Sequence, residues 1–137
     1  MTAQTIIHKV QELALPPGSF IVFGSCPMAA VGIRESQDID LFITEETDAL
    51  LHRRGWQRVD SKAGDLQLEY AEFDTHTNWH IGSYNPSLQG LLATAMVIDD
   101  VPFGALEEVK AWKSVLGRSK DIADIALIDA FLGSSQA

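Results

Sequence analysis

Two aspartates separated by one residue are the first candidates for chemistry. Asp38 and Asp40 flank Ile39 at the start of the segment DIDLFI, which becomes fully apolar after the second acid. Alternate residues of a β-strand point to the same side, so the two carboxylates share a face with their Cα atoms about 7 Å apart. Because the strand continues into Leu-Phe-Ile, its acidic end must face away from the core or be compensated by charge. The pair therefore favours a bound cation over a plain surface strand.

A glycine-serine turn is the second candidate. Gly24 and Ser25 follow the apolar run Phe20–Phe23 and precede a short helical stretch at residues 28–31. Glycine permits a tight turn, and the first N–H groups of a helix together with the serine hydroxyl can hold an anion such as a phosphate. Pro27 has no backbone N–H, so the start of this helix has one hydrogen-bond donor fewer for an anion. The alternative is that Ser25 only caps the helix that follows.

The elements that must position these residues alternate between helices and strands. Apolar spacing and turn residues predict helices over residues 5–15, 28–31, 45–54, 85 to about 93, 105–116 and 120–132. Strands are expected over residues 20–23 and 38–43, with two or three more among residues 56–59, 66–73 and about 75–81, while residues 96–98 and 101–103 flank a turn at Asp99 and Asp100. The expected fold is α/β (α+β), with a mixed sheet of about five strands flanked by helices. Residues 1–137 form one domain, on which the C-terminal helices at about 105–133 pack.

Helix boundaries are marked by capping residues. Thr44 is expected to cap the helix over residues 45–54, and Gly55 to end it. Near the C-terminus, Gly117 ends one helix, while Ser119 caps the next, which Gly133 is expected to end.

Composition limits the possible functions. The chain has 137 residues, with 10 basic and 19 acidic side chains, for a formal net charge of −9. Such a surface disfavours unaided binding to duplex DNA or to an anionic membrane. The single Cys26 excludes an intramolecular disulfide and a cysteine-based zinc site. The N-terminal segment lacks the unbroken apolar stretch of a signal peptide, so a cytoplasmic protein is expected.

Residues 20–44, FIVFGSCPMAAVGIRESQDIDLFIT, resemble the nucleotidyltransferase superfamily (polymerase-β-like). The resemblance consists of an apolar strand, Gly-Ser, a short helix and Asp-x-Asp on the next strand. Residues 98–132 resemble the C-terminal helices of small, minimal bacterial nucleotidyltransferases, in which an Arg-x-Lys-Asp-x-x-Asp segment follows a lysine-bearing helix. Together the two segments cover roughly half of the chain.

The resemblance implies a metal-dependent transfer reaction. In it, Asp38, Asp40 and a third acid hold two Mg²⁺ ions, and Gly24 and Ser25 bind the triphosphate of a nucleotide, for which ATP is the first choice. An acceptor hydroxyl attacks the α-phosphate, and pyrophosphate is released. The acceptor is a small molecule, a protein or an RNA end, and the sequence does not identify it.

The resemblance places the third acid within a strand, and Phe73-Asp74-Thr75-His76 is the nearest match. Asp74 is the choice, so the expected catalytic and metal-binding set is Asp38, Asp40 and Asp74. Glu72 is the runner-up because it has the same strand parity, whereas Glu69 would face the other side of a regular strand. The alternative is that these acids lie on a solvated strand edge.

A basic cluster near the C-terminus could face the triphosphate. It contains Lys110, Lys113, Arg118 and Lys120, of which Lys113 and Lys120 are the chosen nucleotide-binding residues. The alternative is that the cluster is solvated and pairs with Glu107, Glu108, Asp121 and Asp124. Trp56, Trp79 and Trp112 are expected in the core or at its rim rather than as platforms that stack on adenine.

Two other functions compete with the enzyme. The first is a non-catalytic or weakly active interaction module of nucleotidyltransferase fold, such as one member of a toxin-antitoxin pair. The second is an α/β domain whose acids are only surface charge. A homo-oligomer or a helical protein partner is also expected, because the terminal helices carry apolar residues, namely Ile122, Ile125, Ile128 and Phe131.

Overall fold

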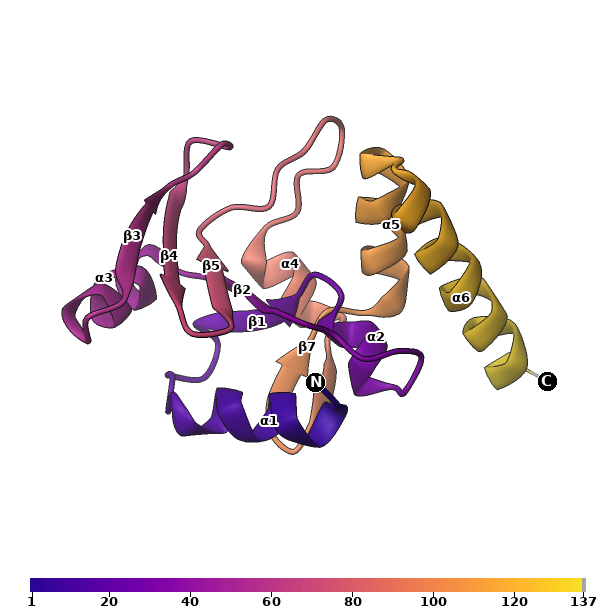
Figure 1. The fold of residues 1–137 in the computed structure, drawn as a ribbon, viewed down its shortest axis with the longest axis horizontal. Coiled ribbons are helices and arrows are strands. Elements are labelled where there is room, and N and C mark those ends of the chain that lie inside the picture. Colours follow the sequence, from indigo (N-terminus) through magenta and orange to yellow (C-terminus); the bar gives the residue numbers. More distant parts are fainter. Residues whose placement is uncertain (137) are drawn as a thin grey trace.

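A computed structural model of the chain describes residues 1–136, whose strands form one mixed seven-stranded sheet (Figure 1). The strands are β1 (Phe20–Phe23), β2 (Ile39–Ile43), β3 (Gln57–Asp60), β4 (Leu66–Tyr70), β5 (Phe73–His76), β6 (Met96–Ile98) and β7 (Val101–Phe103). Their order across the sheet is β3-β4-β5-β2-β1-β7-β6. The fold class is thus the expected α+β arrangement, with seven strands instead of about five.

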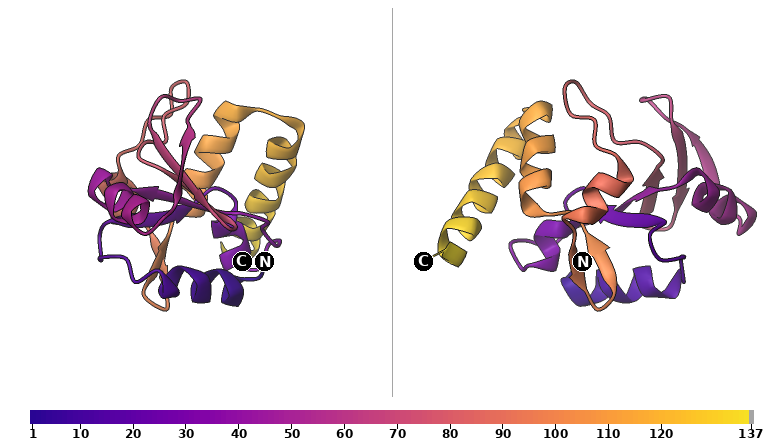
Figure 2. Two further views of the ribbon diagram at one scale, coloured as in Figure 1. Left: turned by 60° about the vertical axis from the view of Figure 1, so that its left-hand side comes forward. Right: turned by 180° about the vertical axis from the view of Figure 1, so that it is seen from behind.

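Helices flank the sheet on both sides and at one end. In the described part of the chain they are α1 (Ala3–Glu12), α2 (Cys26–Ala30), α3 (Glu45–Arg53), α4 (Leu88–Ala93), α5 (Leu106–Leu116) and α6 (Ser119–Gln136). Figures 1 and 2 show α1 along one side of the sheet, α3 beside β3 and β4, and α5 and α6 as an adjacent pair at the opposite end of the molecule.

The strand that carries the acidic pair lies in the middle of the sheet. β1 pairs with β2 antiparallel, whereas β2 pairs with β5 and β1 pairs with β7 in parallel. The register places Asp40 of β2 opposite Asp74 of β5, and Phe42 opposite His76. Hydrogen bonds to a neighbour on each side therefore fix the position of β2.

Both faces of the central strands are covered, which explains why β1 is apolar throughout. Phe20 and Val22 of β1 join a core cluster with Ile6, Ile7 and Val10 of α1. Ile21 and Phe23 face the other way, into a second cluster that contains Phe42 of β2 and Leu88 and Leu91 of α4. Asp40 alternates with Ile39 and Leu41, so it belongs to the same face as Phe42.

Several capping predictions are confirmed. The Thr44 hydroxyl accepts a hydrogen bond from the backbone N–H of Thr47 at the start of α3. Gly55 follows that helix with a φ of +97°, and Gly117 ends α5 in the left-handed conformation. The turn between β6 and β7 is formed by Asp99 and Asp100, both with positive φ.

The expected strand over residues 66–73 is wrong. It is two strands, β4 and β5, joined by a tight turn at Ala71 and Glu72, and Ala71 has a φ of +50°. The turn contains neither Gly, Asn nor Pro, so no local signal marks it. The expected strand over residues 75–81 is correspondingly displaced, because β5 ends at His76 and a loop follows it.

The terminal helices also differ from expectation. α1 spans Ala3–Glu12 rather than residues 5–15, because Ala14 adopts a positive φ of +50°. Gly133 lies inside α6 and does not end it, since a single glycine in a helix costs only about 1 kcal/mol. Ser119 is the first residue of α6, and the Asp121 carboxylate caps the helix by accepting the backbone N–H of Arg118.

The apolar residues of α6 do not form one exposed surface. Ile128 is buried against Met28, Leu106 and Val109. Ile122, by contrast, is 62% exposed.

Within residues 1–136, no helix combines the length and the apolar character needed to cross a membrane.

Candidate functional site

Asp40 and Asp74 form the centre of the candidate site. They are register partners on the adjacent parallel strands β2 and β5, so their side chains lie on the same face of the sheet. Asp74 Oδ1 accepts a hydrogen bond of 2.7 Å from Gln67 Nε2 of β4. Asp38 precedes β2 by one residue and has the strand parity of Asp40. The structure therefore brings Asp40 and Asp74 together on one face, with Asp38 in the bend just before β2, near enough for its charge to act on Asp40.

The glycine-serine turn passes directly beside Asp40. Gly24 has a φ of +67°, and a Cβ at this position would lie 2.2 Å from Asp40 Oδ2. Any other residue would collide with the carboxylate and would also be strained in its backbone. Glycine is thus required here for both reasons, and the turn and the acid form one site.

Burial raises the pKa of Asp40 to about 7, and the negative charges of Asp74 and Asp38 contribute in the same direction. The positive charge of Lys113 opposes this change without cancelling it. The acidic face therefore carries more negative charge than the surrounding protein compensates. A divalent cation would relieve this repulsion.

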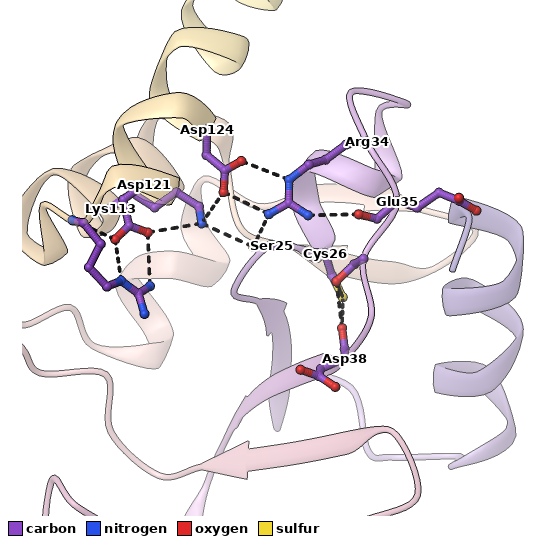
Figure 3. Close-up of polar contacts among 10 residues, drawn as sticks. Ser25, Cys26, Arg34, Glu35, Asp38, Lys113, Asp121 and Asp124 are labelled. Carbon is purple, nitrogen blue, oxygen red and sulfur yellow. Dashed lines mark hydrogen bonds and ion pairs between the residues drawn. The ribbon is translucent and has the colours of Figure 1, made fainter.

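The backbone of Asp38 is held by buried polar groups. Its carbonyl oxygen accepts hydrogen bonds from Cys26 Sγ at 3.1 Å and from Ser36 Oγ at 2.9 Å. Burial raises the pKa of the Cys26 thiol to about 11, so the thiol stays protonated and acts as a donor. In Figure 3 the Asp38 carboxylate itself makes none of the marked contacts.

The alternatives to Asp74 occupy different positions from those expected. Glu72 lies in the turn before β5, and its carboxylate forms an ion pair of 2.8 Å with Lys9 of α1. Glu69 is the register partner of Asp74 on β4, so it lies on the same face and not on the opposite one. Both parity expectations were wrong because the turn at Ala71 breaks the strand.

Ser25 does not cap the helix that follows it. Its side chain makes no hydrogen bond to an N–H of α2. Instead, Ser25 Oγ accepts hydrogen bonds from Arg34 Nη2 at 3.0 Å and from Lys113 Nζ at 3.2 Å (Figure 3). A hydroxyl that accepts two hydrogen bonds retains its own O–H as a donor. The hydroxyl of the turn and the cationic groups of Arg34 and Lys113 therefore lie within hydrogen-bond distance of one another.

Two aspartates of α6 hold these cations. Asp124 accepts two hydrogen bonds from Arg34, at 3.0 and 2.9 Å, and pairs with Lys113 at 2.9 Å. Asp121 lies 3.8 Å from Lys113 and accepts hydrogen bonds from Arg118. Burial alone would raise the pKa of Asp124, but the hydrogen bonds from Arg34 and Lys113 outweigh it and lower the pKa. The helix therefore fixes Lys113, which is only 3% exposed, against the turn.

Arg34 is a site residue that was not predicted from the sequence. It follows α2 in a polar segment, and its bidentate partner, Asp124, is 90 residues away. The sequence signal that could have pointed to this pair is the Arg-x-Lys-Asp-x-x-Asp segment, of which Asp124 is the last acid.

Lys120 is not brought to the site. It is exposed in the first turn of α6, and the described part of the chain offers it no ion pair. Lys110 pairs with Asp129, and Arg118 pairs with Asp121. The ion-pairing alternative is thus confirmed for Arg118 and Lys113, which pair with the expected Asp121 and Asp124, although Lys113 is buried and not solvated. The partner of Lys110, Asp129, was not expected.

The donor set suits Mg²⁺ in its chemistry. All candidate ligands are carboxylate oxygens, which hard cations prefer. Among residues 1–136, no three His, Cys, Asp or Glu side chains already converge on one point as a cage for an ion. Mg²⁺ is usually bound by one or two carboxylates together with substrate phosphates, so the acids fit an ion that enters with a nucleotide.

No protein-family model and no curated protein matches the chain. Among solved structures, a crystal structure of the nucleotidyltransferase ANT(2'')-Ia in complex with adenylyl-2''-tobramycin is similar. The match has a TM-score of 0.54 at 19% sequence identity, and it covers 96% of this chain and 87% of that chain. The chain has a nucleotidyltransferase-like fold. The fold expected from residues 20–44 and 98–132 is thereby confirmed.

Proposed function

We propose that the protein is a Mg²⁺-dependent nucleotidyltransferase that transfers AMP from ATP to an acceptor hydroxyl and releases pyrophosphate. The observation that carries this proposal is the placement of Asp40 and Asp74 in register on adjacent parallel strands, with Gly24 against the Asp40 carboxylate. The nucleotidyltransferase-like fold supports the same conclusion.

The acids would hold the metal. Asp38, Asp40 and Asp74 are the proposed ligands of two Mg²⁺ ions, and the repulsion that raises the pKa of Asp40 favours their binding. When bound, the metal ions neutralise charge on the triphosphate and stabilise the attacking and leaving oxygens. Phosphate oxygens would complete the coordination that the three carboxylates begin.

The turn and its two cations would bind the triphosphate. The Lys113 ammonium and the Arg34 guanidinium each lie within 3.2 Å of the Ser25 hydroxyl oxygen. Phosphate oxygens accept hydrogen bonds from all three groups. Asp121 and Asp124 position Lys113 and Arg34 and are not themselves expected to touch the substrate.

The transfer itself is an in-line displacement at the α-phosphorus. The acceptor oxygen forms the new P–O bond while the bond from the α-phosphorus to the bridging oxygen of pyrophosphate breaks. The hydroxyl proton passes to a carboxylate of the site or to water. Most of the rate enhancement is expected from positioning and charge stabilisation.

Incubation with Mg²⁺ and α-labelled ATP tests the proposal directly. Three acceptor classes are offered, namely polyhydroxylated small molecules, RNA with a free 3′ hydroxyl, and total protein. The label should appear on one class together with pyrophosphate, and Asp40→Asn should abolish it. Asp60→Asn, which changes an exposed carboxylate on β3, is the matched control and should retain transfer. Bound nucleotide without transfer to any class would favour the non-catalytic interaction module.

A further inference from the structure

A cavity of about 460 Å³ lies at the β6 end of the sheet, away from the acidic face. It is lined by the end of α1, the chain before β1, the end of α4 and the β6–β7 hairpin. Its floor includes the buried side chains of Val10, Phe20 and Val101. These side chains belong to the core cluster on one side of the sheet, whereas Asp40 shares the other side with Phe42. The floor is thus separated by the sheet from the proposed metal ligands.

A proline opens this cavity between β1 and β7. Within the described chain, the register of these parallel strands joins a single pair, Val22 and Phe103. The backbone N–H of Gly104 donates to the carbonyl oxygen of Val22 at 2.9 Å. In a continued parallel ladder, the N–H of residue 102 would donate to the carbonyl oxygen of Phe20. Residue 102 is Pro102, which has no N–H, so the ladder stops there and the strands diverge.

The divergence leaves the carbonyl group of Phe20 without the donor that a continued ladder would supply. The carbonyl of Val22 points to β7, and that of Phe20, two residues earlier on the same strand, points the same way. Figure 1 shows the β6–β7 hairpin running away from β1 toward α1. A hydrogen-bond acceptor of the backbone therefore points into the space between the two strands.

The rim of the cavity at the β6–β7 turn is acidic. Asp99 and Asp100 form this turn, and both line the cavity. Gln11 Nε2 of α1 donates to the backbone carbonyl oxygen of Asp99 at 3.0 Å, which ties the turn to the helix. Among residues 1–136, neither carboxylate has a hydrogen bond or an ion pair. The two carboxylates and the Phe20 carbonyl are all acceptors, so the cavity combines an apolar floor with groups that favour a positively charged donor.

We propose that this cavity binds a small organic cation, namely an apolar molecule that carries an ammonium or guanidinium group. The volume is within the range of small-molecule sites, about 300–1,000 Å³. The apolar body of the ligand would cover the floor, while its cationic group pairs with the carboxylates at the rim. An anion would be repelled by these carboxylates and by the net charge of −9. The inference does not depend on the proposed nucleotidyl transfer.

Three probes of one shape and different charge test the class of the ligand. Phenylpropylamine is cationic at neutral pH, phenylpropanol is neutral, and phenylpropanoate is anionic. Each is titrated into protein labelled with nitrogen-15, and the amide chemical shifts are followed by NMR. The amine should shift the amide signals of Val97 and Val101 saturably, with a dissociation constant of about 1 mM or lower. The alcohol should bind about threefold more weakly, and the anion more weakly still.

A double variant tests the role of the rim. Asp99→Asn together with Asp100→Asn removes both charges and keeps residue types that tolerate a positive φ. It should lower the affinity for the amine to that for the alcohol. Asp60→Asn together with Glu46→Gln is the matched control, because it removes the same charge from exposed positions on β3 and α3. The control should keep the preference for the amine.

A second variant tests the location of the apolar body. Val97 lines the cavity and is 64% exposed, so a larger side chain there narrows the opening without changing the buried core. Val97→Trp should weaken binding of the amine and the alcohol alike, whereas Val97→Thr, which has nearly the same volume, should not. The spread of the amide signals shows whether each variant is folded.

Competition separates this cavity from the acidic face. Asp40→Asn should bind the amine as the wild type does, and Mg-ATP should not displace the amine. Equal affinity of the wild type for all three probes would overturn the proposal, as would an amine preference that survives the loss of both Asp99 and Asp100. Displacement of the amine by Mg-ATP, or its loss in Asp40→Asn, would place the cation on the acidic face instead and would also overturn the proposal.

Discussion

Asp40 and Asp74 are opposite one another on two parallel strands, and the cation that acts on Asp40, Lys113, is already held by Asp124 of α6. Repulsion between the acids is therefore a built-in property of the protein without metal. A divalent cation that binds between them should stabilise the fold, and removal of either carboxylate should remove that response.

Metal-free protein should lose stability as the pH rises toward 7. The pKa of Asp40 is about 7 in the folded protein against 3.8 for an unperturbed aspartate, so the folded state holds its proton more tightly. The stabilisation that comes from this tighter proton binding by Asp40 is complete below about pH 4 and is lost as the pH rises through 7. In the presence of a chelator, the melting temperature of the wild type should fall more steeply with rising pH than that of Asp40→Asn. Parallel curves for the two proteins would contradict it.

Gly24→Ala should disrupt the site. The new Cβ would meet Asp40 Oδ2 at 2.2 Å, so either the turn or the carboxylate must move. We expect a destabilisation of about 2–3 kcal/mol and loss of the Mg-nucleotide effect on melting temperature. Gly32→Ala is the control, because Gly32 also has a positive φ but a Cβ added there would meet no atom within 4 Å. It should cost about 1 kcal/mol and preserve ligand binding.

Asp124→Asn should destabilise the protein by about 3 kcal/mol, because it removes the nearer of the two carboxylates that pair with the buried Lys113 and also the partner of Arg34. Asp129→Asn breaks the exposed pair with Lys110, whose two side chains are 42% and 51% exposed, and should cost less than about 1 kcal/mol. Urea denaturation of both variants measures the difference. Equal losses would show that the contact between α6 and the turn carries no special stability.

Asp74→Asn should lose the Mg-dependent response, whereas Glu72→Gln should keep it. Glu72 is engaged by Lys9 on α1, and Asp74 is opposite Asp40. Glu69→Gln is a further comparison, because Glu69 shares the face of Asp74. Melting temperatures with and without Mg-ATP decide between the three acids. A retained response in Asp74→Asn with a lost response in Glu69→Gln would reassign the third ligand to β4.

The sequence contained enough information to predict the local chemistry. Asp38 and Asp40 were placed on one strand face by the two-residue period, and Gly24 was placed in a turn by the apolar strand before it. The structure shows the turn at Gly24 and its close contact with Asp40, whereas β2 begins at Ile39, so that Asp38 lies in the bend before the strand. Local periodicity and turn chemistry are sufficient for such features because they depend on residues close in sequence.

Long-range features of the site could not be predicted in the same way. The pairing of Arg34 with Asp124 depends on how α6 packs, and nothing near Arg34 in the sequence indicates it. Lys120 was chosen from its position in a basic cluster, but the helix turns it to solvent. The faces of Glu69 and Glu72 depended on a turn without a glycine, asparagine or proline, so the strand parity was misassigned.

Melting temperatures of the wild type and of Asp40→Asn, each with ATP plus Mg²⁺ and with ATP plus chelator, decide whether the acids bind metal. In the wild type, Mg-ATP at 100 times its dissociation constant should add about 2.7 kcal/mol, and ATP without metal far less. Asp40→Asn should be at least as stable as the wild type in the chelator and should show no Mg-dependent gain, because an amide is a poorer ligand for a hard cation. Asp60→Asn should respond as the wild type does. An Asp40→Asn protein that keeps the full Mg-dependent gain would contradict the proposed metal site.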